Sequence, residues 1–119
     1  SVKDSVVWRK AGEGPPAEWS VELPVSGEWD VLVKWPASAG RSREAVYEVA
    51  ASDGVKRIVA NQRPSYQWFK LGRFLFDDPK AVKVRLLAQG GPGTVVAEAV
   101  RFIGPAEGSV QPQAKVLGY

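Results

Sequence analysis

Hydrophobic and polar residues alternate along most of this chain with a period of two. The clearest stretch places Trp29, Val31, Val33 and Trp35 on one side and Asp30 on the other. Strict alternation of this kind is typical of a β-strand with one buried face. No window of about 12 residues has the three-to-four spacing of an amphipathic helix. The pattern therefore predicts an all-β protein.

Turn signals divide the chain into short segments. Residues 24–27 (PVSG), 52–54 (SDG) and 90–93 (GGPG) combine the residues that favour tight turns. Asp-Gly between two alternating segments is a strong hairpin signal. The segments recur at roughly 8–12 residues, which is the strand spacing of sandwiches and jelly rolls. We expect an antiparallel β-sandwich of seven to eight strands.

The alternation changes phase in one of the expected strands. Phe69 and Leu71 share one parity, Phe74 and Phe76 share the other, and Gly72 lies at the change. An extra residue in a strand has this effect, and glycine is common at such positions. We therefore predict a β-bulge at Gly72.

One domain accounts for the alternating part of the chain. A length of 119 residues is typical of a single domain. We assign residues 1–103 to it, although the alternation does not define the first strand before residue 19. Residues 94–103 are apolar on both faces, as in one central sandwich strand. Residues 104–119 have no periodicity and are expected to form a C-terminal tail or linker.

The composition excludes the commonest catalytic designs. The residues are 45% hydrophobic and 24% charged, with no Cys and no His. Without Cys there is no disulfide, thiolate zinc site or cysteine nucleophile, and without His there is no Ser-His-Asp triad. Asp77 and Asp78 precede Pro79, where turn formation explains them. We expect a binding or packing module and not an enzyme.

The charges are unevenly distributed. Residues 1–53 carry 6 Lys and Arg against 9 Asp and Glu, whereas residues 54–101 carry 9 against 3, within a net charge of +3. Nucleic-acid binding would require a clustered basic stripe and a recognisable motif. We therefore expect no nucleic-acid partner. We also expect the isolated domain to be monomeric.

We expect neither a membrane span nor a signal peptide in this chain. No apolar run approaches the roughly 18 residues that a span requires. The chain begins with Ser1 and has no initiator Met, so we expect a fragment of a longer protein.

Aromatic, amide and basic residues gather in two expected loops. Sugar-binding modules stack pyranose rings on flat aromatic faces and bond the hydroxyls through amides and charges. Arginine can also hold a sugar carboxylate through paired hydrogen bonds. The candidates are Tyr66 and Trp68 for stacking, Asn61 and Gln62 for hydroxyls, and Arg41, Arg43 and Arg63 for carboxylates.

Each candidate has a structural alternative. Trp19, Trp29 and Trp35 are in phase with core residues and are expected to be buried. Trp68 could pack in the same way, while Trp8 remains open to both interpretations. Such amides as Asn61 and Gln62 often satisfy backbone groups at the end of a strand. An exposed arginine in a Gly/Ser-rich loop, such as Arg43, is most simply a solvated charge.

An ordered set of motifs resembles the carbohydrate-binding-like domain at the C-terminus of golvesin and of xanthan lyases. Its segments are 23–31 (LPVSGEWDV), 35–37 (WPA), Arg41 with 45–47 (AVY), 53–54 (DG), 61–62 (NQ), 68–76 (WFKLGRFLF) and 95–102 (VVAEAVRF). The resemblance covers residues 19–103, with Trp29 in the aromatic position of the first motif and Glu98 where the family usually has Asp. The stretch before it departs from the pattern.

The resemblance carries expectations about fold and function. It implies a jelly-roll, galactose-binding-like sandwich that is a non-catalytic accessory module of a larger secreted, cell-surface or periplasmic bacterial protein. It suggests polysaccharide binding, with an acidic polymer as one option. The alternative is a structural or interaction domain that packs against its parent enzyme and binds no sugar. Arg41 lies at a family position, which favours anchoring of its loop.

Glu98 is a carboxylate within an otherwise apolar segment. A buried charge must be paired or coordinated. One interpretation is an ion pair with Arg101 or Arg41. The other is a structural calcium site with Asp4, because related jelly-roll modules often place a last-strand acid beside an N-terminal one. Calcium prefers six to eight oxygen ligands, and the sequence offers only these two carboxylates. We expect no cofactor otherwise.

Overall fold

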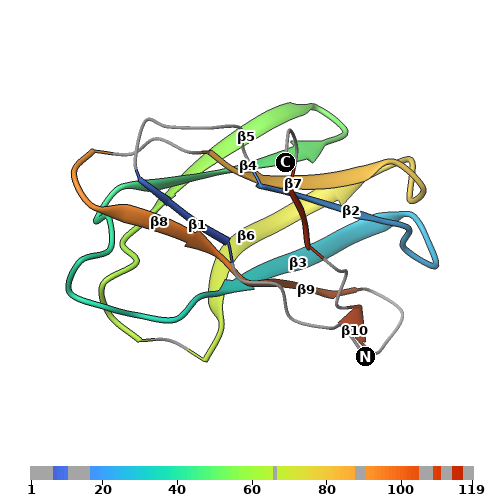
Figure 1. Ribbon diagram of the computed structural model, residues 1–119. Helices are drawn as coiled ribbons and strands as arrows, with labels where there is room; N and C mark the ends of the chain where they lie inside the picture. The colour runs from blue at the N-terminus through green and yellow to red at the C-terminus, as the bar shows by residue number, and fades with distance from the viewer. Residues whose placement is uncertain are drawn as a thin grey trace.

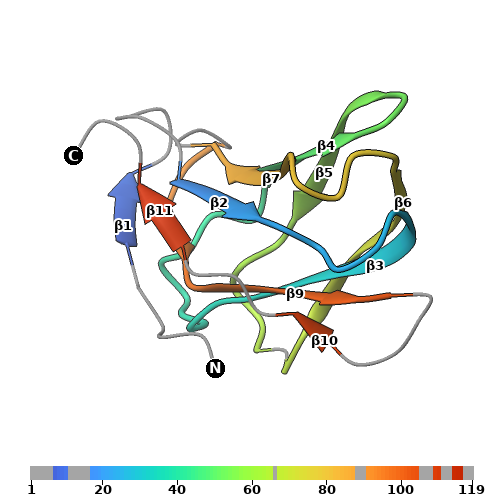
Figure 2. The ribbon, with the colours of Figure 1, turned by 90° about the vertical axis from the view of Figure 1, so that its right-hand side faces the viewer.

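The computed structural model describes residues 7–10, 17–65, 67–87, 91–104, 109–110 and 114–116. Within these residues two antiparallel sheets face each other, as Figures 1 and 2 show. The four-stranded sheet has the order β10 (Ser109–Val110), β9 (Ala99–Ile103), β3 (Gly27–Lys34) and β6 (Phe69–Phe76). The five-stranded sheet has the order β11 (Ala114–Val116), β2 (Ala17–Val21), β7 (Val82–Leu86), β4 (Ala45–Ala51) and β5 (Gly54–Ala60). A further antiparallel pair joins β1 (Val7–Lys10) to β8 (Thr94–Ala97).

The predicted all-β sandwich is confirmed. Eight strands, β2 to β9, lie between residues 17 and 103. The prediction of one strand over residues 94–103 is wrong, because the structure has two strands there. β8 pairs with β1, whereas β9 pairs with β3. The two strands meet at Glu98, which belongs to neither. In the segment expected to be a tail, β10 pairs with β9 and β11 pairs with β2.

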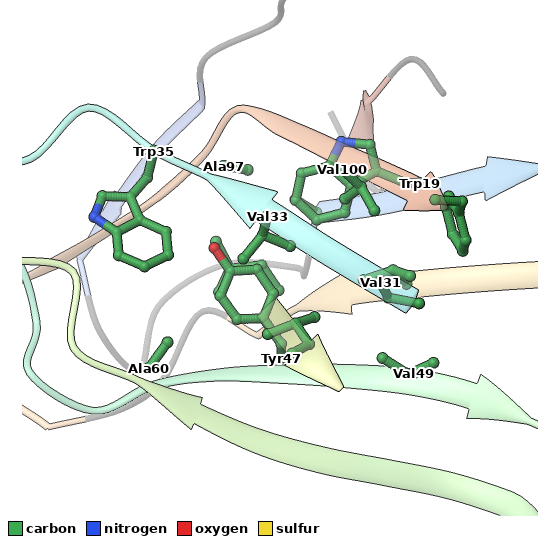
Figure 3. Close-up of a cluster of buried hydrophobic side chains, with 14 of the residues drawn as sticks. Trp19, Val31, Val33, Trp35, Tyr47, Val49, Ala60, Ala97 and Val100 are labelled. Carbon is green, nitrogen blue, oxygen red and sulfur yellow. The ribbon is translucent and has the colours of Figure 1, made fainter. Parts of the chain in front are cut away.

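Three tryptophans lie in the core between the sheets, as the alternation predicted. Trp19, Trp29 and Trp35 are 1%, 0% and 3% exposed. Trp19 stacks on Tyr47, with ring centroids 6.5 Å apart, and Trp35 packs against Phe69 at 5.6 Å. Figure 3 shows valines of β3 and β4 filling the space between these rings. Most of the aromatic surface therefore stabilises the fold and is unavailable to a ligand.

The bulge predicted at Gly72 is confirmed. Val31 pairs with Gly72 but the next residue, Leu32, pairs with Lys70, so Leu71 is the extra residue. Gly72 has a φ of +151°, a conformation that side chains disfavour. The extra residue brings Leu71 and Phe76, from either side of the phase change, into the same core.

The described part of the chain has no helix of the length and apolar character needed to cross a membrane.

Candidate binding site

Three loops meet at one end of the sandwich, at the left in Figure 1. They are the connection from β3 to β4, the segment that follows β5, and the start of β8. The N–H of Gln62 donates to the carbonyl of Ser42 at 2.9 Å, and the N–H of Ser42 donates to the carbonyl of Thr94 at 2.7 Å. These backbone bonds place the predicted loop residues 41–43 and 61–63 side by side.

Arg41 anchors this loop end from inside. Arg41 is only 4% exposed. Its Nε donates to the carbonyl of Pro36 at 2.9 Å, and Nη1 donates to Oγ1 of Thr94 at 3.4 Å. Burial lowers the pKa of the guanidinium from its ordinary value. Arg41 thus holds two loops together, as the family position suggested, and we remove it from the residues expected to meet a sugar carboxylate.

Gln62 is fully buried and also has a structural role. Its Oε1 accepts from the N–H of Val96 at 2.9 Å, and its Nε2 donates to the carbonyl of Val96 at 2.9 Å and to the hydroxyl of Tyr47 at 3.0 Å. The side-chain amide therefore pairs with β8 as a neighbouring strand would. Burial raises the pKa of the Tyr47 phenol, and the Glu98 carboxylate adds to this effect. A Gln62 contact with sugar hydroxyls is excluded by this burial.

Asn61 is exposed and shapes the turn that follows β5. Its Oδ1 accepts from the N–H of Arg63 at 3.0 Å. That bond involves only the side-chain oxygen, and because Asn61 is exposed its NH₂ group remains a candidate for sugar hydroxyl groups.

Arg43, which is exposed, and Arg63, which is half-buried, line a common hollow. Arg43, Glu44, Arg63 and Pro92 surround a volume of about 230 Å³. Arg63 is fixed there by an Nε bond of 2.9 Å to the carbonyl of Arg41. The hollow therefore combines two guanidinium groups with one carboxylate. Sequence reasoning missed Glu44 and Pro92, although Glu44 directly follows the candidate Arg43.

The glycine before β8 keeps these loops close together. Gly93 has a φ of +100°, and a Cβ there would lie 2.9 Å from the backbone of Arg41. We expect Gly93→Ala to lower the free energy of unfolding by about 2 kcal/mol, measured by urea denaturation. The control is Gly40→Ala, where no atom lies within 4 Å of the added methyl group. Equal stability of the two variants would contradict this account of the loop.

Trp68 lies close to two cations beside the start of β6. The Nζ of Lys34 is 5.5 Å from the centre of its ring, and Cζ of Arg101 is 5.6 Å away. The ring is partly exposed, so it combines an aromatic face with positive charge. Tyr66, the other stacking candidate, and the side chain of Trp8 lie outside what the structure describes.

Glu98 has a cationic partner that the sequence analysis did not name. Its Oε2 lies 3.9 Å from Nζ of Lys34, and its side chain is 12% exposed. Lys34 therefore contacts both Glu98 and the Trp68 ring. Asp4, the proposed partner in a calcium site, lies outside the described residues. Among those that are described, no group of three or more Asp, Glu, His or Cys could hold a metal ion.

Comparison with known proteins identifies relatives of this chain. A family model, the Golvesin C-terminal domain, matches residues 7–104. A xanthan lyase from Bacillus sp. (strain GL1) is 33% identical over 98 residues, which cover 78% of this chain and 10% of that protein. The solved structure of a Paenibacillus xanthan lyase superposes with a TM-score of 0.74 over 86% of this chain and 12% of that one, at 20% identity. The likeness to the solved structure shows the sandwich fold. This chain spans about a tenth of the length of the Bacillus xanthan lyase.

Proposed function

This chain belongs to the Golvesin C-terminal domain family, and from that premise we propose that it is a non-catalytic accessory module that binds an acidic polysaccharide. Its relatives are much longer proteins, which supports a module within a larger polypeptide. We place that polypeptide outside the cell or at the cell surface, as the family suggests. The observation that carries the proposal is the hollow between Arg43 and Arg63.

The hollow has the chemistry that an acidic sugar requires. Guanidinium groups bind carboxylates through two parallel hydrogen bonds, with both charge and geometry matched. Glu44 can accept a hydrogen bond from a sugar hydroxyl in the same space. The volume of about 230 Å³ is smaller than a typical small-molecule pocket of roughly 300–1,000 Å³. We therefore propose that it takes a single acidic sugar residue of a polymer.

We propose Trp68 as a second contact, outside the lining of the hollow. It follows Arg63 by five positions, and the intervening Pro64 carbonyl accepts a bond from Nε1 of Trp35 at 3.2 Å. An aromatic ring flanked by Lys34 and Arg101 suits a sugar that carries a negative group. We propose Trp68 as a stacking contact, and keep Tyr66 and Asn61 as neighbouring contacts.

A non-catalytic role is supported by the acidic residues. Glycoside hydrolysis requires two carboxylates flanking one bond. The adjacent pair Asp77 and Asp78 instead belongs to a turn, where Oδ1 of Asp78 accepts from the N–H of Lys80 at 3.0 Å. In the hollow, Glu44 is accompanied by two arginines and not by a second acid.

We expect Arg43→Ala to weaken binding to an acidic polysaccharide by about tenfold, because it removes a charge-assisted hydrogen bond. Affinity electrophoresis in gels containing acidic or neutral polysaccharides measures the effect. Arg43 is exposed, so its loss should leave the fold intact. The matched control is Arg57→Ala, which removes the same charge on β5; its retardation by each polysaccharide, relative to its own mobility in a gel without polysaccharide, should match that of the unchanged protein.

Two outcomes would count against the proposal. Equal retardation of the two arginine variants would remove the hollow from the binding site. Absence of retardation on every polysaccharide, with the protein folded, would favour the packing alternative. Trp68→Ala and Trp68→Phe then test stacking, since only the second variant keeps a flat ring.

A further inference from the structure

On the outer face of the five-stranded sheet, acidic side chains lie beneath the more exposed basic side chains that they pair with. Nε of Arg85 lies 2.9 Å from Oε1 of Glu18, with side-chain exposures of 42% and 6%. Nε of Arg57 lies 2.8 Å from Oε2 of Glu48, with exposures of 64% and 14%. Lys83, at 52%, also approaches Glu18. The carboxylates are therefore recessed, and an approaching molecule meets positive charge.

Exposed valines accompany these cations on β5. Val55 and Val59 are 61% and 59% exposed, the largest exposures among the large hydrophobic side chains of the described residues. They flank Arg57 on one face, because β5 pairs through Ala50↔Val55, Glu48↔Arg57 and Val46↔Val59. A hollow of about 220 Å³ adjoins Val55, lined also by Glu48, Ala50, Lys83 and Arg85. The outer surface of this strand thus alternates valine, arginine and valine.

Among the described strands, β5 is the last in its sheet, at the upper edge in Figure 1. Such an edge offers backbone N–H and C=O groups to a strand from another molecule. A second copy of this chain fits poorly. Antiparallel pairing of two β5 strands about their midpoint would place Arg57 directly opposite Arg57, and like charges in that position are destabilising. A register shift of two residues would place arginine against valine.

Beyond the proposed sugar site, we propose that β5 binds an extended segment of a partner protein in which an acidic residue alternates with apolar ones. Added antiparallel to β5, that segment places its acid opposite Arg57 and its apolar residues opposite Val55 and Val59. Lys83 and Arg85 lie on β7, across β4 from β5, and add positive charge to the same sheet face that attracts the acidic segment at longer range. Main-chain hydrogen bonds supply affinity, and the alternation sets the register.

The test uses two synthetic peptides, one with the central sequence Val-Thr-Glu-Thr-Val and one with Lys in place of Glu. Backbone amide NMR shifts of the whole chain locate and measure binding. We expect the acidic peptide to shift the Gly54–Ala60 signals saturably, and the basic peptide to bind about tenfold more weakly. Arg57→Glu should reverse this preference.

Two further variants distinguish specific peptide binding at β5 from non-specific binding to the protein surface. Val59→Asn should weaken acidic-peptide binding by removing the apolar pairing without changing charge, whereas Leu75→Asn, which changes a 43% exposed residue of the other sheet, should not. Thermal unfolding of each variant verifies its fold. Equal binding of both peptides, shifts outside β5, or the absence of saturation would overturn the proposal. So would β5 shifts caused by self-association or by an acidic polysaccharide alone.

Discussion

Replacing Gln62 with leucine is expected to lower the free energy of unfolding by about 4 kcal/mol, because several buried polar groups lose their partners together. Leucine has a similar size but cannot bond the N–H and carbonyl of Val96 or the hydroxyl of Tyr47. Each buried group left without a partner costs about 1–3 kcal/mol. Urea denaturation followed by tryptophan fluorescence measures the change.

Two companion variants test whether the hydrogen bonds are responsible. Asn61→Leu changes the exposed neighbour and should cost less than about 1 kcal/mol. Gln62→Glu introduces a carboxyl whose pKa burial raises in the folded state, so its protonated form is favoured there. That raised pKa makes the variant's stability greatest at acidic pH, and the stability falls as pH rises through the folded pKa. Similar losses for Gln62→Leu and Asn61→Leu would contradict the assigned role.

Replacing Trp29 with alanine is expected to cost about 4 kcal/mol, since it empties a large fully buried site. The Trp29 ring is 0% exposed, and its Nε1 donates to the carbonyl of Val25 at 3.2 Å. The ring also lies directly over Gly104, where a Cβ would be 2.3 Å from one of its carbons. Denaturant titration, with the slope against denaturant checked for two-state behaviour, measures the loss.

Gly104→Ala tests the same contact from the opposite side. We expect a loss of about 2 kcal/mol from the collision of the added methyl group with the Trp29 ring. Combined with Trp29→Leu, the same change should cost less than half as much, because the smaller side chain leaves space. Additive losses in this double-mutant cycle would show that the two residues do not interact.

The alternation of side chains predicted the sandwich because each strand buries one face. Trp29, Val31 and Val33 are all 0% exposed, as their shared parity requires. The phase change at Gly72 could be read in the same way, because a bulge shifts every residue beyond it. The break between β8 and β9 could not be predicted from the alternation. A period of two indicates which face is buried but not which neighbour a strand pairs with, so 94–103 looked continuous.

The candidate site was only partly accessible to sequence reasoning. Arg41 and Gln62 have the side chains of ligand-binding residues, yet both are buried because groups distant in sequence satisfy them. Val96, the partner of Gln62, is 34 positions away, and its contribution is a backbone group that every residue type carries. Arg43 and Arg63 lie in the loops that the sequence predicts, but only the folded chain shows that they line one hollow.

The bonds that join the loops at this end bear on the entropy of binding. The Arg63 guanidinium is already held by the Arg41 carbonyl, and the preceding residue is bonded to both Ser42 and Val96. A ligand entering the hollow thus meets side chains and backbone that have already lost much of their conformational freedom. Under the proposed function, binding then requires little additional ordering, so the proposed sugar residue would retain more of its interaction energy as affinity.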